Sequence, residues 1–373
     1  MPASSPELRL LLLACDVDVT RALERARPLL GGALDGERLL ALAAHHGLSG
    51  LLHRLLRSEP GALPQALRER LAARARELAA RALLLRDQAR QTVALLERAG
   101  VAALVLKGPA LAARWPEPAL REAGDLDLLV RRADAGRAWD ALLRAGWGEL
   151  LPVGPRLRRA ALRSEREQPF VGAGPFPLDL HWGLFDPHVW PVADEDEVWG
   201  AAVPLPVGEG PPLRTLGPAH TLSLLVLHGA KHLWSRLGWL VDLQALAPSA
   251  AAWEAAAAAP DAARAVGLAL RLGREALGLS GPPGAAAPGE HPALVPVLRA
   301  VRAGWETPRD LPPLLSLRLQ LRLREGPRAR LRLTLGELLV PTAEERALLP
   351  LPPGLDPLLA GLRLVRLLGR HVR

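Results

Sequence analysis

Strand-length apolar runs occur in only one part of this chain, residues 101–216, and sequence typical of helices fills both sides of it. Outside that part, Ala, Leu, Arg and Glu dominate, and these residues favour helix. The chain therefore predicts an α+β fold. We expect an N-terminal helical region (1–99), an α+β core (100–216) and a C-terminal helical bundle (217–373). Within the core we predict strands at 102–106, 125–130, 167–171 and 176–182, with a helix at 133–145.

Two segments of the chain leave local alternatives open. We predict a long helix over 65–98, ended by Gly100, and a strong helix over 218–235. Residues 201–216 suit either a last pair of strands or an irregular crossing. A Pro/Gly-rich linker is expected at 280–288. Residues 314–335 alternate Leu with Arg, which suits a β-hairpin or two Arg-rich helices, and we favour the helices.

Composition excludes several classes of protein. A hydrophobic content of 49% is typical of a globular chain, and the lone Cys15 excludes a disulfide framework or a cysteine-based zinc site. No apolar run approaches the roughly 20 residues that span a bilayer, and the N-terminus is a poor signal peptide. We therefore expect a cytoplasmic protein with no membrane partner. The net charge of +8 reflects a solvated, Arg-rich surface, so a nucleic-acid partner is disfavoured, although the charge alone does not exclude one.

Only two lysines, Lys107 and Lys231, stand against 45 arginines, and Ile, Asn and Tyr are absent. The rare residues have AT-rich codons, so the gene is expected to be GC-rich. Such a bias replaces Lys by Arg wherever only positive charge matters. The surviving lysines are therefore candidates for sites that need a compact ammonium with three donors. The alternative is that both survived by chance.

Two carboxylates share one face of a predicted strand. Asp125 and Asp127 are two residues apart, so their side chains point to the same side. The apolar residues around them, including Leu126 and Leu128, would bury the strand. Buried unpaired carboxylates are costly, and oxygen-only ligands of this kind suit Mg²⁺. The alternative is a strand end with solvated acids.

A third acid lies on another predicted strand. Asp179 and His181 share one face of the strand 176–182. A third carboxylate facing Asp125 and Asp127 would complete a two-metal site for in-line phosphoryl transfer. A salt bridge from Asp179 to an arginine is the alternative. Upstream, a turn at Lys107-Gly108 follows the first strand, where backbone amides can approach a phosphate.

The predicted helix 218–235 carries an unusual polar stripe. His220, Thr221, His228, Lys231, His232 and Ser235 fall within an arc of about 120°. This stripe suits a phosphate-binding cleft. His228 and His232 could also chelate Zn²⁺ through their i,i+4 spacing, although no third ligand is evident. Packing of the stripe against the α+β core is a third interpretation.

Several segments together resemble the bacterial "uncharacterised nucleotidyltransferase" family of the DNA polymerase beta-like superfamily. The resemblance covers about residues 80–370. It rests on L-K-G-P-A-L (106–111), W-P-E-P-A-L-R (115–121), G-D-L-D-L-L-V (124–130), A-G-W (145–147), P-L-D-L-H-W (177–182) and L-H-G-A-K-H-L-W…G-W-L-V-D-L (227–243).

This resemblance implies a small mixed β-sheet with flanking helices and an accessory helical bundle, and it implies a catalytic site and its ligands. Asp125, Asp127 and Asp179 would be the catalytic carboxylates and would bind two Mg²⁺ ions, with Mn²⁺ as an alternative ion. An NTP such as ATP would be bound by the remaining candidates, which are Lys107, Gly108, Arg121, His181, His228, Lys231 and His232. The superfamily's turn is usually Gly-Gly or Gly-Ser, and Lys107-Gly108 stands in its place.

The resemblance implies transfer of an NMP group from an NTP to an acceptor, with release of pyrophosphate. The acceptor, whether small molecule, peptide or protein, is not indicated. A second hypothesis is a non-catalytic nucleotide-binding or antitoxin-like regulatory module with the same fold. A third is a basic helical scaffold that binds RNA, and the lack of interleaved aromatic and basic residues argues against it.

Overall fold

The structure is a computed structural model, and its described residues form two compact units that each draw on separate parts of the chain. The first unit contains 1–86, 108–123 and 218–311, and the second contains 87–107, 124–217 and 312–373. The structure describes residues 4–369 with the exception of 33, 60, 151, 153–154, 187, 191–193, 209, 280–290, 341–344, 346–347, 350 and 352–355.

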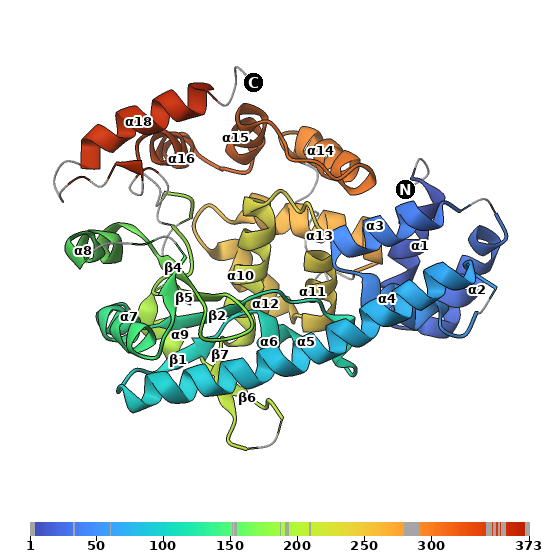
Figure 1. The fold of residues 1–373 in the computed structure, drawn as a ribbon. Coiled ribbons are helices and arrows are strands. Elements are labelled where there is room, and N and C mark those ends of the chain that lie inside the picture. The colour runs from blue at the N-terminus through green and yellow to red at the C-terminus, as the bar shows by residue number, and fades with distance from the viewer. Residues whose placement is uncertain are drawn as a thin grey trace. The chain divides into compact units, whose positions relative to one another are not determined.

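The first unit is helical throughout its described residues (Figure 1). Its elements are α1 (Pro6–Ala14), α2 (Val19–Leu30), α3 (Gly36–His46), α4 (Ser49–Leu56), the first part of α5 (Gln65–Arg98), α6 (Gly108–Ala112), the 3₁₀ turn η1 (Pro118–Leu120), α10 (Pro218–Lys231), α11 (Gly238–Leu246), α12 (Ala250–Ala258), α13 (Ala263–Leu277) and α14 (Leu294–Glu306).

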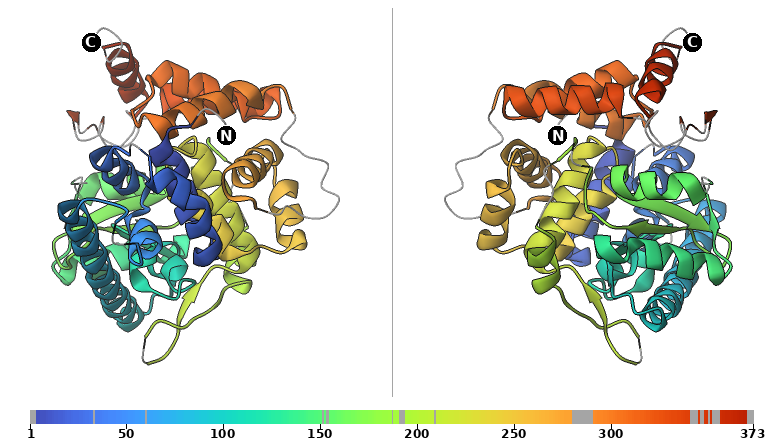
Figure 2. Two further views of the ribbon diagram at one scale, coloured as in Figure 1. Left: turned by 90° about the vertical axis from the view of Figure 1, so that its right-hand side faces the viewer. Right: turned by 90° about the vertical axis from the view of Figure 1, so that its left-hand side faces the viewer.

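The second unit is built on a mixed sheet, which in the described residues has seven strands in the order β3-β4-β5-β2-β1-β7-β6. The β6–β7 hairpin projects from this sheet in both views of Figure 2. The strands are β1 (Ala103–Val105), β2 (Leu126–Val130), β3 (Gly148–Glu149), β4 (Glu167–Val171), β5 (Leu178–His181), β6 (Val203–Leu205) and β7 (Leu213–Thr215). The unit's helical elements are the end of α5, η2 (Arg132–Asp134), α7 (Ala135–Arg144), α8 (Pro155–Ser164), α9 (Glu195–Gly200), α15 (Pro313–Arg322), α16 (Pro327–Leu339) and α18 (Asp356–Gly369).

The core of the second unit forms where α7 covers the sheet. Trp139 of α7 is fully buried and meets the Phe170 ring of β4 edge to face, at 5.7 Å between ring centroids. Every residue of β2 is buried, so this central strand is shielded from solvent on both faces. An ionised side chain on β2 therefore needs a partner in the folded protein.

The α+β fold expected from the sequence is confirmed, and so are the predicted strands, within a few residues. Of the two alternatives for 201–216, the pair of strands is present as β6 and β7, which are antiparallel. The alternating segment 314–335 forms α15 and α16, as favoured. The predicted linker 280–288 lies outside the described residues.

One predicted helix ends earlier than expected. The prediction ran to Ser235, whereas α10 ends at Lys231. Leu233 and Trp234 have left-handed backbones, with φ of 50° and 49°, and these conformations end the helix. Gly229 makes the turn feasible, because a Cβ there would lie 2.6 Å from atoms of the Trp234 ring. The apolar Leu233 and Trp234 gave no sequence signal for a left-handed turn.

Candidate functional site

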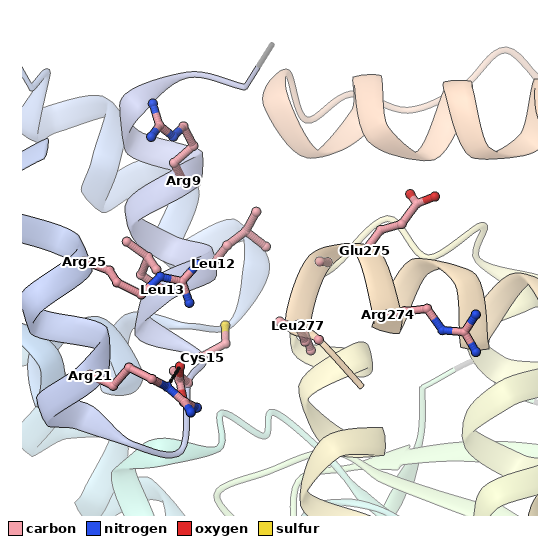
Figure 3. A pocket seen from close by; sticks show the side chains of 12 residues that line it. Arg9, Leu12, Leu13, Cys15, Arg21, Arg25, Arg274, Glu275 and Leu277 are labelled. Carbon is pink, nitrogen blue, oxygen red and sulfur yellow. Dashed lines mark hydrogen bonds and ion pairs between the residues drawn. The ribbon is translucent and has the colours of Figure 1, made fainter. Parts of the chain in front are cut away.

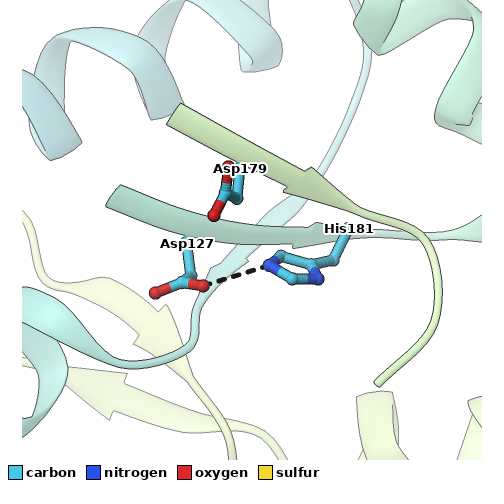
Figure 4. A group of neighbouring side chains, drawn as sticks. All are labelled: Asp127, Asp179 and His181. Atoms are coloured by element: carbon cyan, nitrogen blue, oxygen red, sulfur yellow. Dashed lines mark hydrogen bonds and ion pairs between the residues drawn. The ribbon is translucent and has the colours of Figure 1, made fainter. Parts of the chain in front are cut away.

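The pairing of β2 with β5 sets the geometry of the candidate site. The two strands are parallel, and their register places Asp127 opposite Asp179 and Leu129 opposite His181. Directly opposed residues of neighbouring strands point to the same face of a sheet. His181, two residues beyond Asp179, lies on that face too. Figure 4 shows the side chains of Asp127, Asp179 and His181 gathered there, and one ligand atom from each lies within 4.8 Å of the others.

Asp127 is the most buried member of this cluster, with 1% of its side chain exposed. Its Oδ1 atom contacts Lys107 Nζ at 2.9 Å and His181 Nε2 at 3.1 Å. Burial alone would raise the pKa of Asp127, but the Lys107 and His181 charges hold that pKa well below its ordinary value. The carboxylate is therefore ionised at neutral pH.

The second oxygen of Asp127 has a different environment. Oδ2 is buried and has no hydrogen-bond partner in the part of the chain that the structure describes. A buried carboxylate oxygen without a donor is costly unless a cation binds it. Asp127 thus uses one oxygen for internal cations and leaves the other available to a ligand.

His181 bridges two carboxylates. Its Nε2 donates to Asp127, and its Nδ1 donates to Glu167 Oε2 at 3.0 Å. Burial lowers the pKa of His181, but Glu167 and Asp127 together raise it to about 10, so the ring carries a positive charge at neutral pH. With both ring nitrogens protonated, His181 orients Asp127 and does not coordinate a metal in this state.

Asp179 has the opposite electrostatic setting to Asp127. Burial raises the pKa of Asp179 to about 6; the His181 charge lowers it, and the Asp127, Glu167 and Asp125 carboxylates raise it. A carboxyl group with a raised pKa among other carboxylates gains most from a bound cation, because the cation removes that repulsion.

The carboxylate oxygens fit a divalent cation. Asp127 Oδ2 and Asp179 are hard oxygen ligands of the kind that Mg²⁺ prefers, and Mg²⁺ retains several waters beside one or two carboxylates. Asp125 lies just before β2, half-buried, and outside the tight cluster. Its charge nevertheless contributes to the raised pKa values of Asp179 and Lys107.

The other predicted binding residues lie elsewhere. Gly108 follows Lys107 with a φ of 32° at the start of α6. Arg121 donates to the buried Asp242 of α11 through Nε at 3.1 Å and through a terminal nitrogen at 3.2 Å. These two bonds link the segment after η1 to α11 within the first unit. Both residues belong to the first unit, whereas Asp127 belongs to the second.

The histidines of α10 form a cluster with a tryptophan of α11. The rings of His228 and His232 lie 4.7 Å apart, and Trp239 lies 5.1 Å from the first and 5.5 Å from the second, between ring centroids. Lys231, on the same helix, is exposed. No zinc-type cluster at these histidines occurs among the described residues.

Sequence reasoning missed three residues that organise these sites. Glu167 orients His181, Asp242 holds Arg121, and Trp239 packs on the two histidines. Asp242 and Trp239 lie within the segment G-W-L-V-D-L that already stood out, at the spacing of one helix face. Glu167 could be linked to His181 only through their antiparallel pairing on β4 and β5. The sequence alone does not show that these two strands are neighbours.

The fold and the carboxylate cluster together define an α+β protein with a site suited to a divalent metal. Residues 32–278 match the family model described as "Uncharacterised nucleotidyltransferase", and the chain belongs to this family. The match begins and ends earlier in the chain than the resemblance in the sequence motifs. Comparisons with curated proteins and with solved structures gave no match. No helix in the described part of the chain combines the length and apolar character needed to cross a membrane.

Proposed function

We propose that the protein is a metal-dependent nucleotidyltransferase that moves an NMP group from an NTP to an acceptor. The acceptor's nucleophilic atom bonds to the α-phosphorus, the bond from that phosphorus to the bridging oxygen of the β-phosphate breaks, and pyrophosphate leaves. Membership of the nucleotidyltransferase family and the carboxylate cluster support this proposal.

The observation that carries the proposal is the unpartnered Oδ2 of Asp127 next to Asp179 on adjacent parallel strands. Two Mg²⁺ ions, or Mn²⁺ in their place, would supply charge neutralisation for the triphosphate and activation of the nucleophile. Asp127 and Asp179 would hold them, and Asp125 would complete the set. His181 and Lys107 fix the orientation of Asp127 through its other oxygen.

The nucleotide would be bound by the other residues that the sequence predicts for this role. Lys107, Gly108 and His181 adjoin the site in the chain or in space, and we propose that they contact phosphate oxygens. We propose the same for Arg121 and for the α10 residues His228, Lys231 and His232. The guanidinium nitrogen of Arg121 that is not bound to Asp242 donates to the Gly108 carbonyl at 3.5 Å, at the Lys107-Gly108 turn.

The test is transfer of label from α-labelled NTPs, each incubated with Mg²⁺, a cell extract as the source of acceptor, and the purified protein. Asp179→Asn should reduce transfer by about 100-fold or more, because it removes a metal ligand at nearly constant volume. The matched control is Asp140→Asn, an exposed aspartate of α7 outside the site. Transfer by Asp179→Asn at the wild-type rate would refute the assignment.

A non-catalytic nucleotide-binding module is the second candidate. The observation that favours it is that Lys107 and His181 already pair with Asp127, so this buried carboxylate has counter-charges without a metal. Such a protein would bind an NTP with the same affinity with and without Mg²⁺ and would label no acceptor. Titration calorimetry in EDTA and in Mg²⁺ separates the two functions.

A further inference from the structure

A cavity of about 520 Å³ lies between α1, α2 and α13, wholly within the first unit. Its volume is within the range of small-molecule sites. Figure 3 shows Arg9 on α1 and Arg25 on α2 at one side of the cavity, with Glu275 and Leu277 of α13 at the other. Leu12, Leu13 and Leu277 give it an apolar part.

Positive charge exceeds negative charge around this cavity, where four arginines meet two acids. Asp16 is bound by Arg21 through both oxygens, at 3.1 and 2.7 Å. Glu275 is bound by Arg302 and, at 2.9 Å, by Arg271, neither of which lines the cavity. Both acids are therefore already neutralised.

Arg9 and Arg25 are not bound in this way, and Arg25 acts on Asp16 only through its charge, which lowers the pKa of that carboxyl. Among the described residues, neither side chain makes a hydrogen bond or an ion pair. The carbonyl oxygens at the helix ends do not need these arginines as donors either. At the end of α1, Arg54 donates to the carbonyl oxygens of Ala14 and Asp16. At the end of α13, backbone bonds through Gly278 and Leu279 satisfy the last carbonyls. The two guanidinium groups are thus available to a ligand.

The cavity also lies partly outside the family's common region. The family match begins at residue 32, so α1 and α2, which provide Arg9 and Arg25, precede it.

We propose that this cavity binds a small organic phosphate, whose phosphate group pairs with Arg9 and Arg25 and whose apolar part rests on the leucines. Guanidinium groups match phosphate oxygens in paired hydrogen bonds, and Arg25 and Arg9 come from two different helices. The apolar walls select a phosphate ester over free phosphate. The proposal does not depend on the function of the carboxylate site.

Phenyl phosphate is a suitable probe, compared with inorganic phosphate and with phenol in ligand-observed NMR titrations of the full chain. We expect saturable binding of phenyl phosphate that is tighter than that of either fragment alone. Arg25→Gln should weaken it by about 10-fold or more, the usual effect of losing a charge-assisted hydrogen bond. Arg27→Gln on the same helix, whose side chain is exposed and pairs with Glu59 outside the cavity, should leave it unchanged.

Two results would overturn the proposal: equal affinity of Arg25→Gln and wild type, or phenyl phosphate binding no tighter than inorganic phosphate. Asp179→Asn identifies binding at the other site. Phenyl phosphate affinity that falls in Asp179→Asn but not in Arg25→Gln assigns the probe to the carboxylates and also rejects the cavity. Affinity retained in Asp179→Asn and lost in Arg25→Gln supports the cavity, whatever the transfer assay shows. Arg25 is exposed, so its replacement should not impair folding.

Discussion

Asp127 and Asp179 are paired on neighbouring strands, yet the charges of their carboxylates have opposite effects on the stability of the folded state. Asp127 carries two ion pairs, and its lowered pKa means that the folded state favours its ionised form. Asp179 has a raised pKa of about 6, so the folded state disfavours its charge at neutral pH. A cation bound at the proposed site would compensate the charge of Asp179 and would use the second oxygen of Asp127.

This difference predicts how the two aspartates respond to neutralisation. Asp127→Asn leaves Lys107 and His181 without their buried counter-charge and should cost roughly 3 kcal/mol of unfolding free energy at pH 7. Asp179→Asn removes an unfavourable charge and should leave stability unchanged or slightly higher. Urea unfolding of both variants in EDTA measures this. Equal destabilisation by the two substitutions would contradict the electrostatic account.

Residue patterns could predict much of this site, but not all of it. The spacing of Asp179 and His181 on one strand, and the apolar frame around Asp127, were sufficient to indicate a shared face. The pairing of Lys107 with Asp127 was not foreseen, since it depends on β1 lying antiparallel beside β2. Asp125 was expected to be equivalent to Asp127, whereas only Asp127 lies within β2.

At the scale of elements, a buried histidine joins three helical segments of the first unit. His46 at the end of α3 donates from Nε2 to the Trp305 carbonyl of α14 at 3.0 Å, and its Nδ1 accepts from the Leu237 amide before α11 at 3.3 Å. Burial lowers the pKa of His46 to about 4. The hydrogen bond to the Trp305 carbonyl raises this pKa, but by less than burial lowers it. The ring is neutral, because Nδ1 accepts the hydrogen bond from the Leu237 amide and therefore carries no proton.

The lowered pKa of His46 predicts that the unfolding free energy falls in mild acid. Its folded pKa lies below the ordinary 6.5, so its contribution is fully present above about pH 6.5 and is lost as the pH falls toward 4. Between pH 7 and pH 5, wild type should lose roughly 2 kcal/mol more unfolding free energy than His46→Gln, which does not titrate. Urea unfolding at both pH values measures the difference. The same pH loss in both proteins would assign it to other groups.

The turn after α10 shows where helix patterns fail as predictors. Apolar periodicity continues through Leu233 and Trp234, yet a fully buried Trp234 folds back on Gly229 and accepts from Trp305 Nε1 at 2.7 Å. Tertiary packing therefore stabilises two left-handed residues that local preference disfavours. A sequence pattern cannot report this, because the partner, Trp305, lies 71 residues away.

The same turn gives an element-scale prediction. Gly229→Ala places a Cβ 2.6 Å from the Trp234 ring and should cost about 1–3 kcal/mol, because the ring cannot shift without losing its other contacts. Gly304→Ala in α14 is the matched control, since a Cβ there meets nothing within 4 Å, and helix propensity should make it neutral or stabilising by up to about 1 kcal/mol. Chemical denaturation of both variants measures the two effects. A Gly229→Ala protein as stable as wild type would show that the turn does not require glycine.

At the scale of the whole molecule, each compact unit is made of stretches that are not consecutive in the chain. The sequence predicts consecutive regions, with 100–216 as the α+β core, whereas the sheet unit also includes 87–99 and 312–373. Gln88 of α5 makes two hydrogen bonds with the Phe176 backbone, at 2.9 and 3.0 Å. Arg324, after α15, is fully buried with its guanidinium 3.5 Å from the centroid of the Trp190 ring. Composition marks where strands occur, but it does not show which distant helices cover them.

These contacts predict that residues 100–216 alone do not form a stable unit. That fragment lacks Gln88 and Arg324, so the buried backbone of Phe176 and the buried Trp190 both lose their partners. We expect the fragment to show no cooperative urea transition and little near-UV circular dichroism, while the full chain shows both. In the full chain, Gln88→Ala should cost about 1–3 kcal/mol, which isolates the contribution of α5. A cooperative transition of the 100–216 fragment with native-like near-UV dichroism would establish it as an independent domain and would show that α5 and the C-terminal helices are accessory to the sheet.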